Sequence, residues 1–352
     1  MKGEANPKPP SAGERPMLRK YALALLGCAG LALAPLAASA ADEVKVGMLR
    51  LPTALFIGID QGFFAAEGID VKPVFFRSGA ELVPALSTGQ IDVATTSPGA
   101  ALFNAMALGV NATIVADYWA SGKDVPSGDS AFIMVRKDLA PYGLFKPQNA
   151  KNLTVAVTAR GQMTELFAYA YLATAGLSPS DVNIVDMPLP DMNAALANHA
   201  VDLASTIDPY ATMLANAGTA VKAVNISAVM PGYVQAVMMY GPRIAKTERP
   251  LGVRFLRAFS KANLYLRAHL ATPAGRVEIA QIYQKYIPID DPSLYQKIGL
   301  AVGPEKLTVV TEGKYALRWQ LDQYVKQGLV TSAPDLRNFV DNSFVEAAAR
   351  TK

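Results

Sequence analysis

The sequence contains one cysteine, Cys28, and two histidines, His199 and His269, in 352 residues. A single thiol forms no disulfide within the chain and no thiolate metal cluster. The motifs G-x-S-x-G, H-E-x-x-H, G-x-G-x-x-G and the P-loop are also absent. His199 follows a predicted helix at the end of a sheet, and His269 lies within a helical stretch, so neither is placed for acid–base work. We therefore expect no catalytic residues, no metal and no cofactor.

Excess charge is also scarce. The chain has 33 Lys and Arg against 29 Asp and Glu, and residues 1–41 hold five of the basic and two of the acidic ones. The remaining 28 basic and 27 acidic residues provide no positive field for a phosphate backbone. A nucleic-acid partner is therefore not expected.

What the first 40 residues do contain is the pattern of a secretory signal. A basic pair at Arg19–Lys20 precedes an apolar run, then Pro35, then the small-residue triplet Ala38–Ser39–Ala40. This order predicts cleavage after Ala40, with Met17 as the initiator. Three alternatives are a transmembrane anchor, a lipoprotein signal that uses Cys28, and cytoplasmic residence, which would leave the apolar run unexplained. After cleavage no cysteine remains, so the exported chain relies on its hydrophobic core alone.

The chain also contains an internal repeat. "QIDVATTSPGAAL" (90–102) returns as "AVDLASTIDPYATML" (200–214), and "TALF" (53–56) returns as "TELF" (164–167). Each copy alternates short apolar stretches with helical ones, which predicts a parallel sheet with helices on both faces. In the first copy we expect strands at 44–49 and 69–76, a helix from Thr53 to Gly68 and another at 79–87. Two copies predict two similar lobes.

The predicted lobes are joined twice. The chain passes to the second lobe near 117–131 and returns near 230–238, and the helical tail after Pro242 has no counterpart in the first copy. We expect this tail to pack around the first lobe. The predicted organisation is a signal peptide at 1–40, lobe 1 at 41–120 plus 236–352, and lobe 2 at 121–235. Two crossings form a hinge with a cleft between the lobes.

Ligand-binding loops are expected at the carboxyl ends of the parallel strands, where equivalent loops of the two copies face the cleft. The first pair is "RLPTALF" and "ARGQMTELF". Each precedes a helix N-terminus, which favours an anion. Thr53 and Thr164 are either helix caps or ligand contacts, and these roles are compatible. Arg160, beside Gly161, offers a bidentate grip on a carboxylate or sulfonate, and Arg50 is a weaker candidate.

Three further groups complete the candidate site. Ser78 and Gly79 offer a hydroxyl and a bare backbone, with helix capping as the alternative for Ser78. Thr96 and Ser97 face Asp208 and Tyr210 in the second copy, and Asp208 either reads a ligand N–H or caps its helix. Aromatic residues at the crossings line the pocket or belong to the core. The candidates from the residues themselves, with Phe56 of the "TALF" stretch, are Thr53, Phe56, Ser78, Gly79, Thr96, Ser97, Tyr118, Trp119, Arg160, Gly161, Thr164, Asp208 and Tyr210.

These stretches carry a resemblance. "GFFAAEGIDV" (62–71), "FRSGAELVPALSTGQIDVATTSPGAAL" (76–102) and "AALANHAVDLASTIDPY" (194–210) resemble the nitrate/sulfonate/taurine group of ABC-transporter substrate-binding proteins, over residues 44–240. The resemblance implies an α/β type II periplasmic binding fold with two lobes, a hinge and an interlobe cleft. By position it implies ligand contacts at Thr53, Ser78, Thr96, Ser97, Gln162, Met163, Thr164 and Asp208.

The resemblance also implies a function. Such a protein is a periplasmic monomer that is not an enzyme, captures a small molecule and delivers it to an ABC permease and its ATPase. The superfamily includes thiamine-pyrimidine precursor proteins, but the cysteine-rich motif of the fungal enzymes among them is missing. The loop "TARGQMTEL" departs from the common "GS" form, and Arg160 with Met163 indicates a larger, partly apolar organic anion. The alternatives are a ligand-sensing receptor for a membrane signalling partner and an enzyme on the same scaffold.

Overall fold

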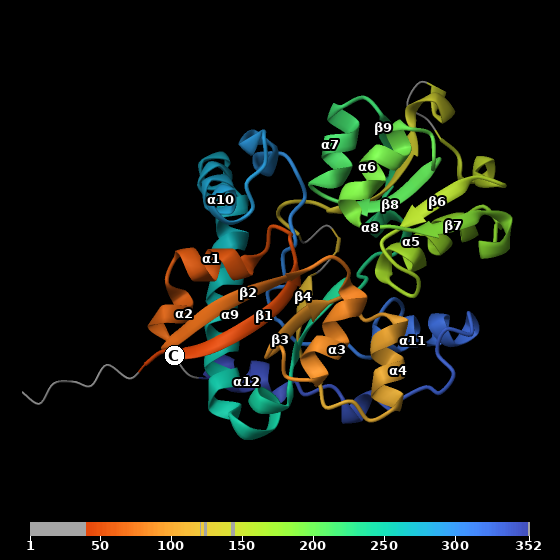
Figure 1. Ribbon diagram of the computed structural model, residues 1–352. Coiled ribbons are helices and arrows are strands. Elements are labelled where there is room, and N and C mark those ends of the chain that lie inside the picture. The colour runs from red at the N-terminus through yellow and green to blue at the C-terminus, as the bar shows by residue number, and fades with distance from the viewer. Residues whose placement is uncertain (1–39, 120, 123–124, 142–144, 351–352) are drawn as a thin grey trace, which may run out of the picture. The chain divides into compact units, whose positions relative to one another are not determined.

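Two five-stranded sheets organise the chain (Figure 1). The computed structural model describes residues 40–119, 121–122, 125–141 and 145–350, so the predicted signal peptide lies outside the described residues. Residues 41–352 form one unit. The first sheet contains β1 (Asp42–Leu49), β2 (Ile69–Phe76), β3 (Val93–Thr96), β4 (Thr113–Trp119) and β10 (Ala236–Tyr240). The second contains β5 (Ala131–Arg136), β6 (Thr154–Val157), β7 (Asn183–Asp186), β8 (Leu203–Ile207) and β9 (Ala220–Asn225).

The two sheets have the same topology. Their strand orders are β2-β1-β3-β10-β4 and β7-β6-β8-β5-β9. In each, the first three strands are parallel, and the fourth is an antiparallel strand inserted before the edge strand. The sequence repeat thus corresponds to a repeated sheet. We call the part around the first sheet lobe 1 and the part around the second sheet lobe 2. The chain passes between them twice, once between β4 and β5 and once between β9 and β10.

Helices surround the two sheets. α3 packs on β1 and β3, and α5 and α6 pack on β8. The helices of the repeated part are α1 (Ala54–Asp60), α2 (Phe63–Ala66), α3 (Leu82–Ser87), α4 (Ala100–Ala107), α5 (Met163–Ala173), α6 (Leu189–Ala197), α7 (Tyr210–Asn216) and α8 (Ile226–Val229). The tail contains α9 (Arg249–Leu270), α10 (Pro273–Tyr286), α11 (Leu317–Lys326) and α12 (Ser343–Arg350).

The structure corrects two helix predictions. The helix expected from Thr53 to Gly68 is divided into α1 and α2, because Gly62 adopts a left-handed conformation with φ 70°. Such a conformation ends the helical hydrogen-bonding pattern and costs glycine little. The helix expected at 79–87 begins as a 3-10 turn at Gly79–Glu81 before α3.

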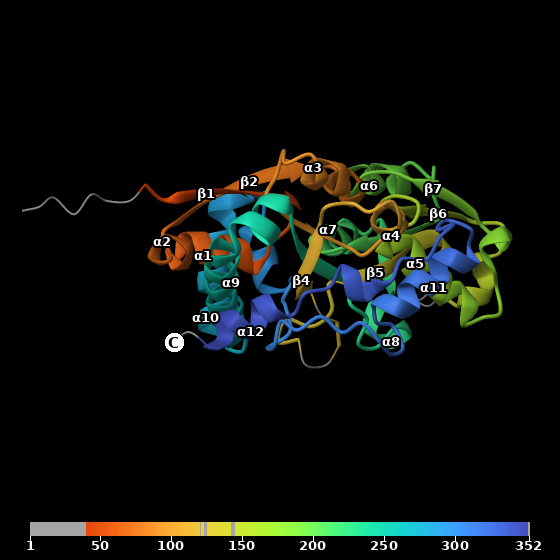
Figure 2. The ribbon, with the colours of Figure 1, turned by 90° about the horizontal axis from the view of Figure 1, so that it is seen from below.

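The tail packs in two places. α9 buries an apolar face, with Phe255, Phe259 and Leu266 at helical spacing, against α1, α10 and α12 on lobe 1. α11 lies elsewhere, beside α4 and α5 (Figures 1 and 2). The side chain of Gln320 on α11 accepts a hydrogen bond from the Tyr233 hydroxyl (2.8 Å) and donates one to the carbonyl of Val234 (2.9 Å). α11 is therefore attached to the return crossing as well as to lobe 1.

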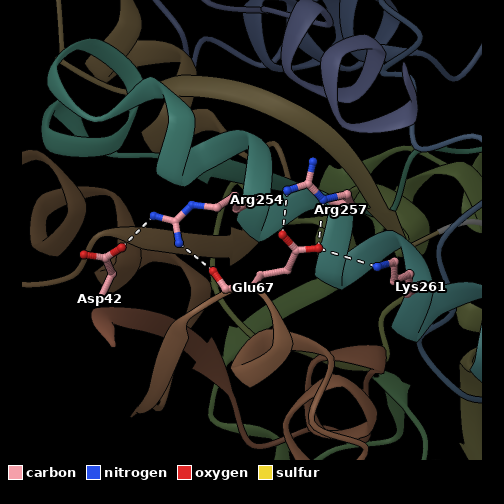
Figure 3. A network of polar contacts seen from close by, with 5 residues as sticks. All are labelled: Asp42, Glu67, Arg254, Arg257 and Lys261. Atoms are coloured by element: carbon pink, nitrogen blue, oxygen red, sulfur yellow. Dashed lines mark hydrogen bonds and ion pairs between the residues drawn. The ribbon is translucent and has the colours of Figure 1, made fainter. Parts of the chain in front are cut away.

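An ion-pair network fixes α9 to lobe 1 (Figure 3). Arg257 donates two hydrogen bonds to the Glu67 carboxylate, at 2.8 Å to Oε1 and 2.5 Å to Oε2. Arg254 donates to the carbonyl of Glu67 and to Asp42 Oδ2. The hydrogen bond from Arg257 is the main cause that lowers the pKa of Glu67, against the opposing effect of burial. The carboxylate therefore stays charged and paired.

We expect Arg257→Ala to lower the free energy of unfolding by about 2 kcal/mol, because it leaves the mostly buried Glu67 carboxylate with only the longer contact from Lys261 at 3.5 Å. The matched control is Arg337→Ala, which removes the exposed pair with Asp335. Exposed pairs contribute little, so the control should leave the unfolding curve unchanged. Urea unfolding of both variants tests this. Equal destabilisation by the two would contradict the anchoring role of Arg257.

Candidate functional site

A cavity of about 70 Å³ lies between the lobes. Its walls come from the carboxyl ends of β1, β3, β4, β6 and β8 and from the start of β10. Because β10 runs antiparallel to β3 and β4, its first residues meet the last residues of those strands. The lining residues are Met48, Leu49, Leu51, Thr53, Gly79, Thr95, Thr96, Ser97, Tyr118, Trp119, Thr158, Gln162, Met163, Thr164, Ile207, Gln235, Ala236 and Ala301. We call this space the inner chamber.

The structure brings together nine of the residues that the sequence predicts for the site. They come from both copies of the repeat and from the first crossing. They are Thr53, Gly79, Thr96, Ser97, Tyr118, Trp119, Gln162, Met163 and Thr164. No lining residue is charged, so the chamber offers a ligand hydroxyls, amides and apolar walls.

The lobes touch directly at the edge of this chamber. The amide of Ala100, at the start of α4, donates to the carbonyl of Gly161 at 2.7 Å. The Ser97 hydroxyl hydrogen-bonds to Gln162 Oε1. Gly99 packs against residues 161–162 of lobe 2 so closely that no side chain fits. A Cβ at this position would lie 2.5 Å from both the Gly161 carbonyl oxygen and Gln162 Nε2. Contact between the lobes therefore depends on a residue without a side chain.

Three helices begin at the chamber without a side-chain cap. Thr53, Gly99 and Gln162 occupy the N-cap positions of α1, α4 and α5, and none makes a capping hydrogen bond through its side chain. The alternative role of Thr164 as a cap is not observed either. Its hydroxyl accepts a hydrogen bond from the amide of Thr158 at 2.9 Å. The N-termini of α1 and α5 lie at the chamber wall with their positive dipole ends, whereas the first amide of α4 donates to Gly161.

Two buried hydroxyls of the lining have no hydrogen bond of normal geometry within the described residues, Thr53 Oγ1 and the Tyr118 hydroxyl. Their residues are only 2% and 4% exposed. Burial raises the pKa of Tyr118 to about 12, although the hydroxyls of Thr53 and Thr95 oppose this shift. Tyr118 therefore keeps its proton at neutral pH and remains a donor. Buried polar groups usually have partners, so these two are suited to a bound ligand.

Four predicted site residues, Arg160, Ser78, Phe56 and Asp208, contact other parts of the protein and do not line the inner chamber. The guanidinium of Arg160 pairs with the fully buried Glu165 (2.6 Å), which also accepts hydrogen bonds from the amide of Gly161 (2.5 Å) and the Tyr169 hydroxyl (2.7 Å). Ser78 accepts from the amide of Ala80 at 3.3 Å, as a cap of its 3-10 turn. Phe56 lies in the core and stacks on Tyr286 with ring centroids 5.2 Å apart.

Asp208 also lies outside the inner chamber. Its Oδ1 accepts from the amide and hydroxyl of Thr212 at 3.0 and 2.7 Å, which is the capping role for α7. Its Oδ2 accepts from the amide of Gly299 at 3.1 Å. Burial raises the pKa of Asp208, against the attraction of Lys222 and these hydrogen bonds. Tyr210 lines a separate hollow at the mouth of the cleft.

Several residues that line the inner chamber were not predicted from the sequence. Thr158 ends the strand before a predicted ligand loop, so its position was a usable signal. Gln235 lies in the predicted return crossing, and Ala301 lies in the tail, which no repeat copy describes. A bridge between Ala301 and Thr53 brings this tail segment into the chamber wall. The buried Glu165 had a signal in the repeat itself, because it replaces Ala54 of the first copy.

Among residues 40–350, apart from the gaps stated above, no three His, Cys, Asp or Glu side chains are grouped to hold a metal. His269 stacks on Tyr265 with ring centroids 3.8 Å apart, and His199 occupies a left-handed turn with φ 60°. No helix in the described part of the chain combines the length and apolar character needed to cross a membrane.

Two lobes of this topology, with a chamber between the carboxyl ends of their strands, define the type II periplasmic binding fold. A sequence model of the NMT1-like family matches residues 37–284, and the chain belongs to that family. A search of curated proteins finds no match.

Solved structures share the fold. The alkanesulfonate-binding protein SsuA of Xanthomonas axonopodis pv. citri, bound to MOPS, has a TM-score of 0.70 at 18% identity, over 85% of this chain and 98% of that one. The nitrate-binding protein NrtA of Synechocystis PCC 6803 has a TM-score of 0.70 at 14% identity, over 88% and 89%. The desulfurization enzyme DSZB has a TM-score of 0.61 at 14% identity, over 88% and 99%.

Proposed function

We propose that the protein is an exported solute-binding protein that captures a small organic anion between its lobes and delivers it to an ABC importer. The observation that carries the proposal is the inner chamber, a space between two lobes whose buried Thr53 and Tyr118 hydroxyls make no hydrogen bond of normal geometry within the described residues. In this proposal the signal at residues 1–40 is removed after Ala40, the protein works as a periplasmic monomer, and a permease and ATPase receive the ligand.

The chamber supports an anion without a charged side chain. Hydroxyl donors and the first turn of α5 line it, and helix N-termini bind sulfonate-like and carboxylate groups through N–H donors and the helix dipole. The acidic group of the ligand enters this neutral chamber. Arg160, Asp208 and Ser78 then act indirectly, by fixing the loops that carry the lining residues.

A thermal-shift screen of the exported, processed protein tests the proposal. The ligands are nitrate, sulfonates, carboxylates and pyrimidines. A ligand at a hundred times its Kd stabilises the folded state by about 2.7 kcal/mol, which raises the melting temperature by several degrees. Mass spectrometry of the same material should show Ala41 as the first residue. A flat result with every acid would contradict the proposal.

Tyr118→Phe and Thr53→Val should separate binding from stability. Each removes a buried hydroxyl that makes no hydrogen bond of normal geometry within the described residues, so we expect little change in stability without ligand. We expect about fivefold weaker binding of the anion, since a neutral hydrogen bond contributes about 1 kcal/mol. Calorimetric titration measures the affinity and thermal unfolding the stability. Weaker binding that accompanies an equal loss of stability would indicate a structural role.

The enzyme alternative has one supporting observation, the shared fold of DSZB. Incubation of the protein with each stabilising ligand, followed by chromatography, distinguishes the two. A binding protein returns the ligand unchanged, and an enzyme releases a product.

A further inference from the structure

A second hollow, of about 270 Å³, lies outside the inner chamber. Lobe 1 contributes the end of β1 and the end of β2 with the residue that follows it. Lobe 2 contributes the N-cap and first two residues of α6 and the first residue of α7. The lining residues are Leu49, Arg50, Leu51, Phe75, Phe76, Arg77, Pro188, Leu189, Pro190 and Tyr210. We call this space the outer chamber.

The two chambers are neighbours. Leu49 and Leu51 line both of them. Both also have walls from the two lobes, so both are formed when the lobes come together. Across the outer chamber's rim, Arg77 approaches Asp191 at 3.4 Å. Leu49 and Leu51 thus form the boundary beside which a molecule that occupies both chambers would lie.

The outer chamber has the charge and the aromatic rings that the inner one lacks. The Arg50 guanidinium lies over the Phe75 ring at 4.1 Å from its centroid. Arg50 makes no ion pair within the described residues, and Phe75 is 37% exposed. Across the chamber, burial raises the pKa of Tyr210, and the charge of Arg50 partly offsets this. Arg50 and Tyr210 line the same hollow from opposite lobes.

The volumes of the two chambers indicate which part of a ligand each can hold. A cavity of about 150 Å³ lined by apolar side chains holds one benzene ring. The inner chamber, at about 70 Å³, is too small for a ring but has room for an acidic group. The outer chamber, at about 270 Å³, is large enough for a ring. Stacked aromatic rings and a guanidinium over a ring face each add attraction beyond the burial of area.

We propose that the outer chamber is an aryl subsite, in which Phe75, Arg50 and Tyr210 hold the ring of an aromatic acid whose acidic group occupies the inner chamber. This rests on the proposed binding function and makes it specific, with arylsulfonates and aryl carboxylates as the preferred ligands. A stack of about 1.4 kcal/mol corresponds to a tenfold difference in affinity. Benzenesulfonate should therefore bind about tenfold more tightly than methanesulfonate.

Calorimetric titration of the exported, processed protein with these two sulfonates tests the proposal. Phe75→Ala and Arg50→Gln should each bring the ratio of the two dissociation constants from about ten to about two. The matched controls are Leu108→Ala, which truncates a side chain that is 89% exposed, and Arg337→Gln, which removes an exposed charge. Both controls should keep the ratio near ten. Thermal unfolding of each variant without ligand verifies that it is folded.

Different results would contradict the aryl subsite alone or the solute-binding function as well. If methanesulfonate binds and benzenesulfonate binds no more tightly, the aryl subsite is wrong and the solute-binding function stands. A ratio that survives both Phe75→Ala and Arg50→Gln also overturns the subsite, because the preference then arises elsewhere. If neither sulfonate binds, nor benzoate or acetate, the solute-binding function fails and the aryl subsite with it.

Discussion

Replacement of Gly99 by alanine should weaken ligand binding about thirtyfold while leaving the protein folded. Gly99 adopts φ −90° and ψ 175°, a conformation that alanine accepts without strain. The new methyl group would lie 2.5 Å from the carbonyl oxygen of Gly161 on the opposite lobe. Such overpacking costs about 2 kcal/mol, which corresponds to the thirtyfold loss. The two lobes can avoid this clash by moving apart about the hinge. The substitution therefore disfavours the closed conformation that binds the ligand and does not disfavour the folded state.

Small-angle scattering and calorimetry test this expectation. The variant should have a larger radius of gyration than the unchanged protein in saturating benzenesulfonate or methanesulfonate, and a higher Kd for both. Ala101→Ser, an exposed change two residues further along α4, is the control and should alter neither quantity. Tight binding by Gly99→Ala would mean that the contact between Gly99 and residues 161–162 is not part of the bound state.

Asp117→Asn should stabilise the protein, increasingly so as the pH rises. Asp117 lies at the end of β4, is 6% exposed and makes no ion pair within the described residues. Burial raises its pKa to about 8, and hydrogen bonds from the amides of Trp119 and Tyr118 offset only part of this. Ionisation at this site therefore disfavours the folded state.

The direction of the pH effect follows from the two states. Between about pH 4 and pH 8 the folded protein holds a proton on Asp117 that the unfolded chain has lost, so stability from this group falls as the pH rises through that window. Above about pH 8, ionisation of Asp117 lowers the free energy of unfolding by an amount on the order of 5 kcal/mol. Asparagine keeps the size and an acceptor oxygen but never ionises.

Melting temperatures of the two proteins at pH 4.5, 6 and 8 measure the effect. The difference should be near zero at pH 4.5 and largest at pH 8. Asp208, whose pKa is also raised, contributes equally to both proteins and cancels in the comparison. A constant difference across the three pH values would show that Asp117 does not titrate in this window.

Much of the fold was readable from the repeat. Residues 90–102 and 200–214 predict equivalent strand–loop–helix units, and both sheets have the same order and the same inserted antiparallel strand. The division of the first helix at Gly62 was not readable, because a glycine within an apolar helical pattern also occurs in continuous helices. The attachment of α11 to the return crossing was not readable either. It depends on hydrogen bonds of Gln320 with Tyr233 and Val234, which are distant in the sequence.

The site was predictable where it follows strand ends. Thr53 and Thr164 occupy equivalent loops, Ser97 follows the end of another strand, and all three line the inner chamber. The charged candidates were harder to place, since a sequence does not show which partner a charge will find. Arg160 pairs with Glu165 in the first turn of the helix that follows it, and Asp208 caps α7 and accepts a hydrogen bond from the amide of Gly299. Whether Arg160 or Asp208 affects ligand choice stays a prediction.

The placement of β10 has a consequence for the order in which the lobes fold. β4 pairs in its sheet with β10 alone, and β10 is synthesised only after the whole of β5–β9. Lobe 2 draws its sheet from one continuous stretch, whereas lobe 1 waits for a strand from the far side of its neighbour. Non-local pairings of this kind form slowly. A chain that emerges from its N-terminus therefore completes its second lobe first, and β1–β4 remain an unfinished sheet until residues 236–240 arrive.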